Sequence, residues 1–364
     1  MRWTGTDVHN RRSFLAGAAA VHLAPTSGWA DAGNAHHLGA AGMQDGSFRL
    51  FGLDAGLQIV FSIPLPARGH AAAAHPVRAE AVAFARRPGT FAIVLDCITG
   101  AVVTTLGAPP ERHFYGHGVF SLDGTRLYTT ENAYELGEGR IGIWAADDGY
   151  RRVGEFHSGG IGPHEITRLP GTDTLVVANG GIDTHPDTGR TKLNIPSMQP
   201  NLTYLDLAGT VLDQTQLPSR FRLSSIRHLC ARSDGLVAFA CQWQGDHASD
   251  TVLQGLHRMH DSMQLLQLPE KKAPTYAGSV AFSQSGDALG VTFPRSDGFA
   301  TWALDDDRSG TWHALRDACG ISPASNGFAV TSGAGDIVTG THAVFAKSIR
   351  FADLNWDNHF VKVT

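Results

Sequence analysis

The chain has few charged side chains, and few of those are lysines. Asp, Glu, Lys and Arg make up 17% of its 364 residues, against about 25% in ordinary proteins. The formal net charge at pH 7 is −5, and only five of the basic residues are lysines. Because nucleic-acid binding requires a surplus of basic side chains, we expect no nucleic acid as a partner.

Long apolar runs and cysteines are also scarce. No stretch after residue 32 has the roughly 18–20 consecutive apolar residues that cross a bilayer, so we expect no stable membrane insertion. The four cysteines lie far apart, without C-x-x-C spacing, and we interpret them as small buried side chains. One or two disulfides are the alternative in an oxidising compartment. The cysteines are Cys97, Cys230, Cys241 and Cys319.

The first 32 residues have the pattern of an export signal. Arg11-Arg12 precede Ser-Phe-Leu and a short apolar stretch, and Ala30-Asp31-Ala32 forms an A-x-A-like cleavage site. This pattern is typical of twin-arginine signal peptides. We therefore expect residues 1–32 to be a signal peptide cleaved near Ala30 or Ala32, and the mature protein to be periplasmic. An N-terminal helix or membrane anchor, the alternative, requires a longer apolar run.

The remaining residues have an all-β pattern with an internal repeat. Apolar runs of five to seven residues alternate with turns, and glycine is abundant, at 42 residues. An Asp-containing turn between two such runs recurs seven times at intervals of 42 to 59 residues. Repeats of this length predict one domain, a seven-bladed β-propeller over 45–364, with 33–44 as linker or first strand. The repeated positions are Asp54, Asp96, Asp147, Asp206, Asp261, Asp305 and Asp353.

A second register places histidines at equivalent points of the repeat. In three copies a His is followed by a strand and a glycine-containing turn, and these copies begin at His117, His164 and His228. By its spacing His70, with its turn at His75-Pro76, begins the preceding unit. The same spacing places Ser279 and Asn326 at this point in the next two units. The C-terminal segment around His359 resembles one more innermost strand, which would complete the blade formed by residues 38–65 and close the ring. We expect only the last unit, between Asn326 and His359, to be short of strands.

Histidines that converge at one mouth of a propeller would suit a metal ion or a haem. We therefore predict iron, copper or haem at His70, His117, His164, His228 and His359. The alternative is that these histidines only hydrogen-bond within the blades. Neighbouring polar residues are candidates for holding the cofactor: Arg112, Glu165, Arg227, Ser279 and Asn326. The longest insertion, after the His-bearing strand of the third unit, offers four further candidate ligands: Asp183, His185, Asp187 and Met198. The alternative is that this Asp- and Gly-rich loop only hydrogen-bonds to itself.

An enzyme is the second hypothesis. Glu165 and His228 could act as acid and base on a lactone or ester, with Arg227 steadying an anionic group. Gly162-Pro163-His164 and Ile226-Arg227-His228 are similar to motifs of propeller lactonases of the phosphogluconolactonase type. Glu131 and Arg112 also lie beside the histidine positions. The competing interpretation is that all four charged residues, Glu165 and Arg227 included, are solvated loop residues. A pure protein-interaction scaffold is the third hypothesis.

Several motifs together resemble the exported propeller family called domain of unknown function 1513. The motifs are Arg86-Arg87-Pro88-Gly89-Thr90-Phe91, Tyr115-Gly116-His117-Gly118, Gly162-Pro163-His164-Glu165, Ala178-Asn179-Gly180-Gly181 through Gly189-Arg190, Ser225-Ile226-Arg227-His228 and Asp357-Asn358-His359. The resemblance implies a propeller like the methylamine-dehydrogenase heavy chain or YVTN proteins. It also implies a role in periplasmic iron acquisition beside imelysin-like and di-haem peroxidase-like partners, and it supplies no catalytic residues.

Overall fold

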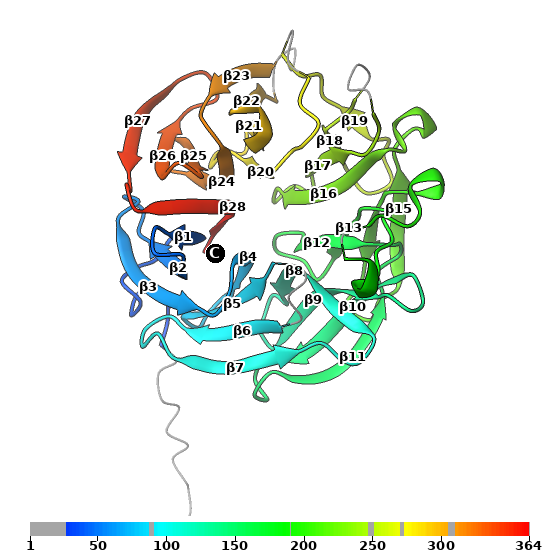
Figure 1. Cartoon of the computed structure of the whole chain (residues 1–364), viewed down its shortest axis with the longest axis horizontal. Helices are drawn as coiled ribbons and strands as arrows, with labels where there is room; N and C mark the ends of the chain where they lie inside the picture. Colours follow the sequence, from blue (N-terminus) through cyan, green and yellow to red (C-terminus); the bar gives the residue numbers. More distant parts are fainter. Residues whose placement is uncertain are drawn as a thin grey trace, which may run out of the picture.

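The protein is a seven-bladed β-propeller (Figure 1). The computed structural model describes residues 27–86, 91–189, 191–246, 251–269, 273–304 and 310–363. These residues form seven antiparallel sheets of four strands each, arranged in a ring around one axis. The predicted all-β, seven-bladed architecture is therefore confirmed.

Each blade is a meander whose first strand lies nearest the axis. Blade 1 consists of β28 (Leu354–Lys362), β1 (His37–Met43), β2 (Phe48–Leu53) and β3 (Ile59–Leu65). Blade 2 consists of β4 (Gly69–Ala74), β5 (Glu80–Ala85), β6 (Phe91–Asp96) and β7 (Val102–Gly107). Blade 3 consists of β8 (Arg112–Phe120), β9 (Arg126–Ala133), β10 (Glu138–Ala145) and β11 (Arg151–His157). Blade 4 consists of β12 (Pro163–Arg168), β13 (Leu175–Asn179), β14 (Asn201–Leu205) and β15 (Val211–Gln216).

The last three blades follow the same order. Blade 5 consists of β16 (Ser224–Ala231), β17 (Val237–Trp243), β18 (Gln254–His257) and β19 (Gln264–Leu265). Blade 6 consists of β20 (Ser279–Phe282), β21 (Ala288–Phe293), β22 (Gly298–Ala303) and β23 (Gly310–Ala314). Blade 7 consists of β24 (Ala318–Ala324), β25 (Gly327–Ser332), β26 (Asp336–Gly340) and β27 (Phe345–Arg350). Short 3₁₀ turns in the connections are η1 (Pro186–Thr188), η2 (Ile195–Ser197), η3 (Ser219–Phe221) and η4 (Pro294–Ser296).

The ring closes within blade 1. β28 pairs antiparallel with β1, from His37 opposite Lys362 to Met43 opposite Leu354. The C-terminal strand is thus the innermost strand of a blade whose other strands come from the start of the fold (Figure 1). This confirms the predicted closure by the N- and C-terminal strands.

Burial explains why so few residues are charged. The strands in the middle of a blade are covered on both faces by neighbouring blades, and all five residues of β13 and of β14 are buried. Only the outermost strands alternate between exposed and half-buried residues, as β11 does. Since most strand positions face other strands, apolar side chains are required at nearly all of them.

Two details of the predicted repeat were wrong. Asp54, Asp96 and Asp147 follow the third strand of their blades, but Asp353 lies between β27 and β28, where one blade passes to the next. The corresponding turn of blade 7 joins β26 to β27 and contains no Asp. The last unit also has its full set of strands, because β25, β26, β27 and β28 lie after Asn326. Asp305 lies outside the described residues.

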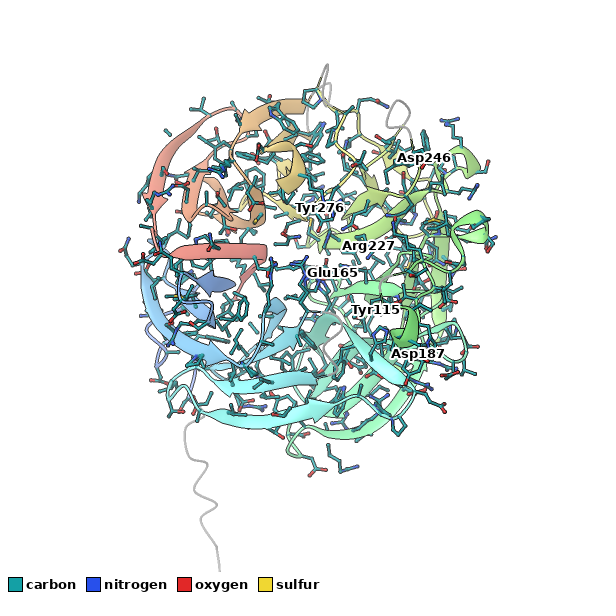
Figure 2. The ribbon with its side chains drawn as sticks, viewed as in Figure 1. Tyr115, Glu165, Asp187, Arg227, Asp246 and Tyr276 are labelled. Carbon is teal, nitrogen blue, oxygen red and sulfur yellow. The ribbon has the colours of Figure 1, made fainter. Side chains whose placement is uncertain are left out.

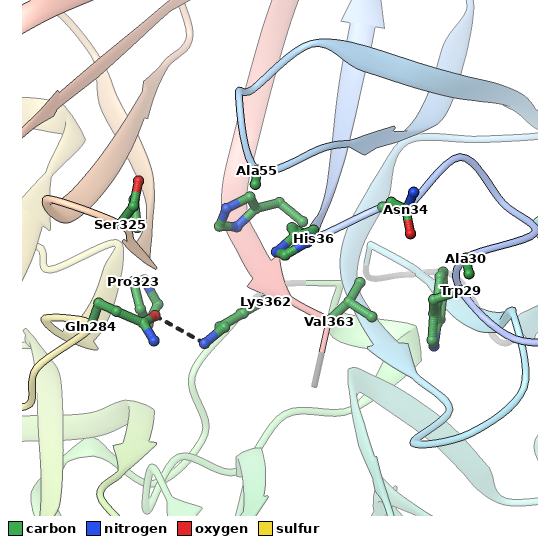
Figure 3. Close-up of a pocket in the computed structure, with 13 residues that line it drawn as sticks. Trp29, Ala30, Asn34, His36, Ala55, Gln284, Pro323, Ser325, Lys362 and Val363 are labelled. Atoms are coloured by element: carbon green, nitrogen blue, oxygen red, sulfur yellow. Dashed lines mark hydrogen bonds between the residues drawn. The ribbon is translucent and has the colours of Figure 1, made fainter.

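Residues 1–26 of the predicted signal peptide lie outside the described residues, whereas the chain from Gly28 onward contacts the propeller. Gly28 forms an isolated β-bridge with Arg78, and the Trp29 indole Nε1 donates a hydrogen bond to the His75 carbonyl at 2.9 Å. Ala32 is buried against blades 1 and 2. This segment borders a cavity of about 620 Å³ that is also lined by Lys362, whose Nζ donates to Gln284 Oε1 (Figure 3).

In the described part of the chain, no helix has the length and hydropathy needed to cross a membrane. The four cysteines are unpaired, and three of them are fully buried. Burial raises the pKa of the Cys97 thiol to about 12. The interpretation of the cysteines as buried apolar side chains therefore describes them better than the disulfide alternative.

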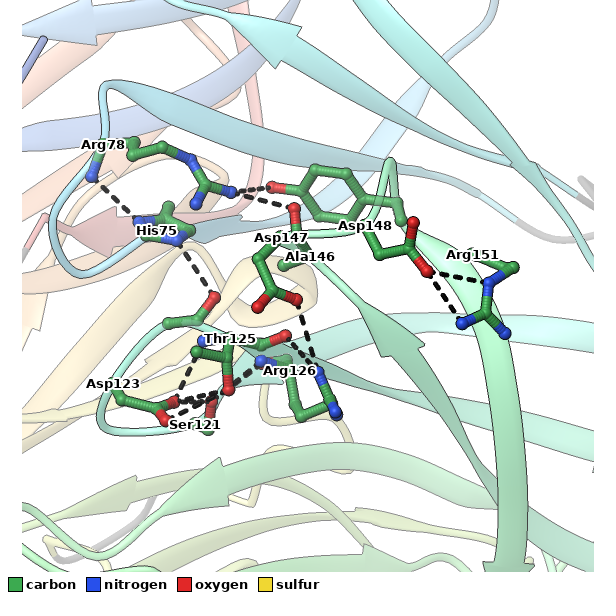
Figure 4. Close-up of polar contacts among 12 residues, drawn as sticks. His75, Arg78, Ser121, Asp123, Thr125, Arg126, Ala146, Asp147, Asp148 and Arg151 are labelled. Atoms are coloured by element: carbon green, nitrogen blue, oxygen red, sulfur yellow. Dashed lines mark hydrogen bonds and ion pairs between the residues drawn. The ribbon is translucent and has the colours of Figure 1, made fainter. Parts of the chain in front are cut away.

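Buried His75 links the turn after β4 in blade 2 to the turn between β8 and β9 in blade 3 (Figure 4). His75 Nε2 donates to the Gly124 carbonyl at 3.1 Å, while His75 Nδ1 accepts from the Arg78 backbone N–H at 2.9 Å. One ring nitrogen donates and the other accepts, which requires the neutral imidazole. Burial, together with the charge of Arg78, lowers the pKa of His75 to about 4.

We expect the metal-free protein to lose stability steeply as the pH falls from 6.5 to about 4. Burial also lowers the pKa of His37 to about 4, and burial lowers the pKa of four histidines near the axis. The unfolded chain takes up these protons near pH 6.5 and the folded chain does not, so unfolding is favoured by about 1.4 kcal/mol per pH unit for each such buried histidine. Glu131 and Glu165, whose pKa values are raised by burial, act in the opposite direction but are fewer.

Urea unfolding of metal-free protein between pH 5 and pH 7.5 measures this dependence. The urea midpoint should fall on acidification, and the fall should be shallower in His37→Gln, because that variant has one buried histidine fewer. A midpoint that does not change with pH would contradict the neutral state of these histidines.

Candidate metal centre

Five histidines lie side by side near the axis, each from the innermost strand of a different blade. Their ring centroids are 4.6–6.2 Å from those of their neighbours. The structure thus brings together all five histidines that the sequence register had singled out. They are His70 of β4, His117 of β8, His164 of β12, His228 of β16 and His359 of β28.

A β-bulge at each histidine turns its side chain toward the axis. The pairing of β12 with β13 skips His164, and that of β16 with β17 skips Arg227, directly before His228. The pairings of β4, β8 and β28 with their neighbours also shift where the histidine lies. Because extra residues bend the strand and redirect side chains, five bulges can point five rings at one place.

One carboxylate lies within the histidine cluster. Glu165 Oε2 is 3.1 Å from His228 Nδ1, and Glu165 Oε1 is 3.8 Å from His117 Nδ1. The Leu229 backbone N–H also donates to this carboxylate, at 3.3 Å. Glu165 comes from β12 and therefore reaches across to the adjacent blades 3 and 5. Burial raises its pKa to about 7.

Four of the five cluster histidines are neutral at neutral pH. Burial lowers the pKa of His228 to about 3 and that of His359 to about 4. The pKa values of His117 and His164 also lie well below the ordinary value, because of burial and then of the charges of neighbouring imidazoles and of Arg227. Neutral imidazole is the form that binds metals.

Hydrogen bonds leave nitrogen lone pairs directed into the cluster. His164 Nδ1 donates to the Arg227 carbonyl at 3.0 Å, which keeps its Nε2 unprotonated, as in many metal sites. His228 Nε2 and His359 Nε2 are buried and have no hydrogen-bond partner among the described residues. His70 Nε2 and His117 Nε2 are 3.2 Å apart. Buried nitrogens without partners are costly unless a ligand satisfies them.

The geometry can accommodate a metal ion in either of two overlapping groups. Within each group the ligand atoms lie within 4.8 Å of one another. Two nitrogens bound to one ion at about 2.1 Å are at most about 4.2 Å apart, so small movements suffice. His117 belongs to both groups. One group is His117, Glu165, His228 and His359, and the other is His70, His117 and His164.

Arg227 and Ser279 lie near the axis in different settings. Arg227 is the extra residue of the β16 bulge, and its Nε donates to Ser225 Oγ at 3.0 Å. It is adjacent to His228, so the three residues of the lactonase hypothesis, including Glu165, do lie together (Figure 2). Ser279 is the buried first residue of β20, a strand that pairs without a register shift.

Asn326 and Arg112 lie away from the cluster. Asn326 is in the turn between β24 and β25, so it does not occupy the position equivalent to the histidines. The bulge of blade 7 falls instead between Ala318 and Ile321. Arg112 forms an ion pair with Glu155 of β11 at 3.1 Å. The buried Glu131 is likewise held by Arg152 of β11, at 2.7 Å.

The long insertion of blade 4 does not bring its predicted ligands to the histidines. His185 lies 3.1 Å from Glu135, and Met198 is buried. The Asp183 backbone N–H donates to Asn194 Oδ1, as expected for a loop that hydrogen-bonds to itself. Asp187 is exposed and lies far from Glu165 in the view of Figure 2.

The family match agrees with the motifs around these bulges. Residues 63–363 match the family model described as "Protein of unknown function (DUF1513)". The chain belongs to this family. The matched range covers β4 to β28, and therefore all five cluster histidines and Glu165.

A similar solved structure supports the propeller fold, and the fold alone. Kuenenia stuttgartiensis hydrazine synthase superposes with a TM-score of 0.59 at 13% identity, over 84% of this chain and 90% of that one. A protein of unknown function from Bacteroides caccae superposes with a TM-score of 0.48 at 13% identity, over 78% and 94%. No curated protein matches the sequence.

Proposed function

We propose that this protein is a periplasmic, non-catalytic propeller that binds a transition-metal ion, iron or copper, at the histidine cluster. The observation that carries the proposal is the convergence of five histidines and Glu165, with ligand atoms within 4.8 Å of one another in each group. Imidazole nitrogen suits iron, copper, zinc and nickel, whereas magnesium and calcium favour oxygen.

A bare ion fits this site better than a haem. The rings are in contact with one another, with centroids as close as 4.6 Å. The pocket that reaches His70 and His164 is about 250 Å³, less than the 300–1,000 Å³ of pockets for drug-sized ligands. A planar macrocycle would have to separate the five innermost strands, and that would disrupt the close packing of the ring.

The family resemblance and the twin-arginine pattern add a setting to this proposal. We infer that the protein works in iron acquisition after export, and that it docks metal-handling partners of the imelysin-like or di-haem peroxidase-like kind. Iron is then the expected ion, with copper as the competitor because it binds imidazole more tightly.

Elemental and absorbance analysis of protein purified from its own periplasm tests the function. We expect about one iron or copper per chain and no haem absorbance band. Metal-free protein should take up one equivalent of either ion on titration. Protein that contains no metal and binds neither ion would overturn the proposal, and a haem band would overturn the choice of a bare ion.

The same protein preparation distinguishes the non-catalytic proposal from the lactonase hypothesis. A panel of lactones and esters should show no turnover that depends on Glu165, Arg227 or His228. Turnover that Glu165→Gln abolishes would replace the non-catalytic function with an acid–base reaction.

A further inference from the structure

A pocket with a cationic lining lies directly over the histidine cluster. His70 and His164 form part of its wall, and its volume is about 250 Å³. Four basic side chains line it, and no carboxylate does so in the described part of the chain. This contrasts with the net negative charge of the chain as a whole. The four are Arg86, Lys192, Arg227 and Arg295.

The four cations reach the pocket from four blades. Arg86 follows β5 of blade 2, Lys192 lies in the insertion of blade 4, Arg227 is in β16 of blade 5, and Arg295 is in η4 of blade 6. They therefore surround the pocket instead of forming one patch. A ligand that engages them all must have negative groups at several separated points.

Three of these cations, Lys192, Arg227 and Arg295, are close enough to repel one another. The charges of Arg227 and Arg295, after burial, lower the pKa of Lys192. Arg295 is fixed by stacking on Tyr276, with its guanidinium carbon 4.5 Å from the ring centroid. Arg86, in contrast, forms an ion pair with Asp357 Oδ1 at 3.5 Å. An anion in the pocket would remove this repulsion.

Neutral donors complete the lining. Trp243 Nε1 is buried without a hydrogen-bond partner among the described residues, and its side chain lines the pocket. Tyr276 receives a hydrogen bond from Asn358 Nδ2 at 2.8 Å, which fixes the ring under Arg295. In Figure 2 Tyr276, Arg227, Glu165 and Tyr115 follow one another near the axis. Buried unsatisfied donors mark places where a ligand can gain hydrogen bonds.

We propose that this pocket binds a small polycarboxylate, with its carboxylates on the surrounding cations and one of them directed at the His70–His164 side of the cluster. Guanidinium groups bind carboxylates bidentately. Separated cations fit several carboxylates on a short carbon skeleton better than the clustered charge of a phosphate. The contact with a bound ion rests on the proposed metal function, whereas the binding of the polycarboxylate does not.

Calorimetric titration of metal-free full-length protein with tricarballylate, a tricarboxylate without a hydroxyl group, tests the proposal. The protein should bind one equivalent. Lys192→Gln combined with Arg295→Gln should weaken binding about 100-fold, because each exposed cation contributes about tenfold. Arg220→Gln combined with Lys347→Gln removes the same charge away from the pocket and should leave binding unchanged.

Three results would overturn the proposal: no binding, equal weakening in the two double variants, or tighter binding of pyrophosphate than of tricarballylate. His117→Ala, which removes a proposed metal ligand and no pocket residue, separates this proposal from the metal function. Tricarballylate binding that persists in His117→Ala supports the pocket even if the wild-type protein binds no metal.

Discussion

Replacing His117 with alanine is expected to lower the affinity for iron or copper about 100-fold or more. His117 is the one histidine shared by both candidate ligand groups, so its loss leaves neither group complete. Substitution of residues that merely orient metal ligands already costs about 10–100-fold in affinity, and a lost ligand should cost more. Competition titration against a chelator of known affinity measures the change.

His185→Ala is the matched control. His185 pairs with Glu135 in the blade 4 insertion and lies outside both ligand groups, so this variant should bind metal as the wild type does. Circular dichroism and the urea midpoint verify that His117→Ala remains folded. If folded His117→Ala binds metal as tightly as wild type, the ion is not at this cluster.

Ending the chain after Asp353 is expected to abolish folding to a stable monomer. The truncated chain lacks β28, so the inner edge of β1 loses its entire hydrogen-bonded partner. The buried side chains of Trp356 and Phe360 are lost as well, and large aromatic side chains removed from a core each cost about 3–5 kcal/mol. The sum approaches the total stability of an ordinary domain, about 5–15 kcal/mol.

Size-exclusion chromatography and thermal unfolding measure this loss. His359→Ala in the full-length chain is the control, because it keeps β28 while removing its metal ligand. We expect that variant to fold and to bind metal more weakly. A truncated chain that remains monomeric with an unchanged melting temperature would show that the closure of blade 1 is dispensable.

The spacing of short apolar runs was enough to predict the number of blades and the closure of the ring. This spacing is informative because every blade buries the same kind of strand, so turns recur at nearly constant intervals. The Asp repeat misplaced Asp353, since blade 7 has no Asp in the turn between β26 and β27. The histidine register misplaced Asn326, which lies in the turn between β24 and β25. Spacing alone counts turns and cannot distinguish a turn within a blade from a passage between blades.

The histidines were predictable as a set, but their chemistry was not. The bulges that aim the rings at one another depend on pairing with the second strand of each blade. The contact between Glu165 and His228 joins blades 4 and 5, and no local pattern specifies it. Lys192 and Arg295 were not singled out, because the loops that contain them have no period, and only the fold brings them over the cluster.

The position of β28 also sets the time at which the site can exist. His70 lies in the first strand after blade 1 and His359 lies in β28, so the ribosome adds the five histidines over nearly the whole length of the fold. A nascent or proteolysed chain that stops between them lacks at least one ligand, as well as the strand that closes the ring. Occupancy by metal of the group that contains His359 would therefore report that synthesis has passed β28 and that the ring has closed.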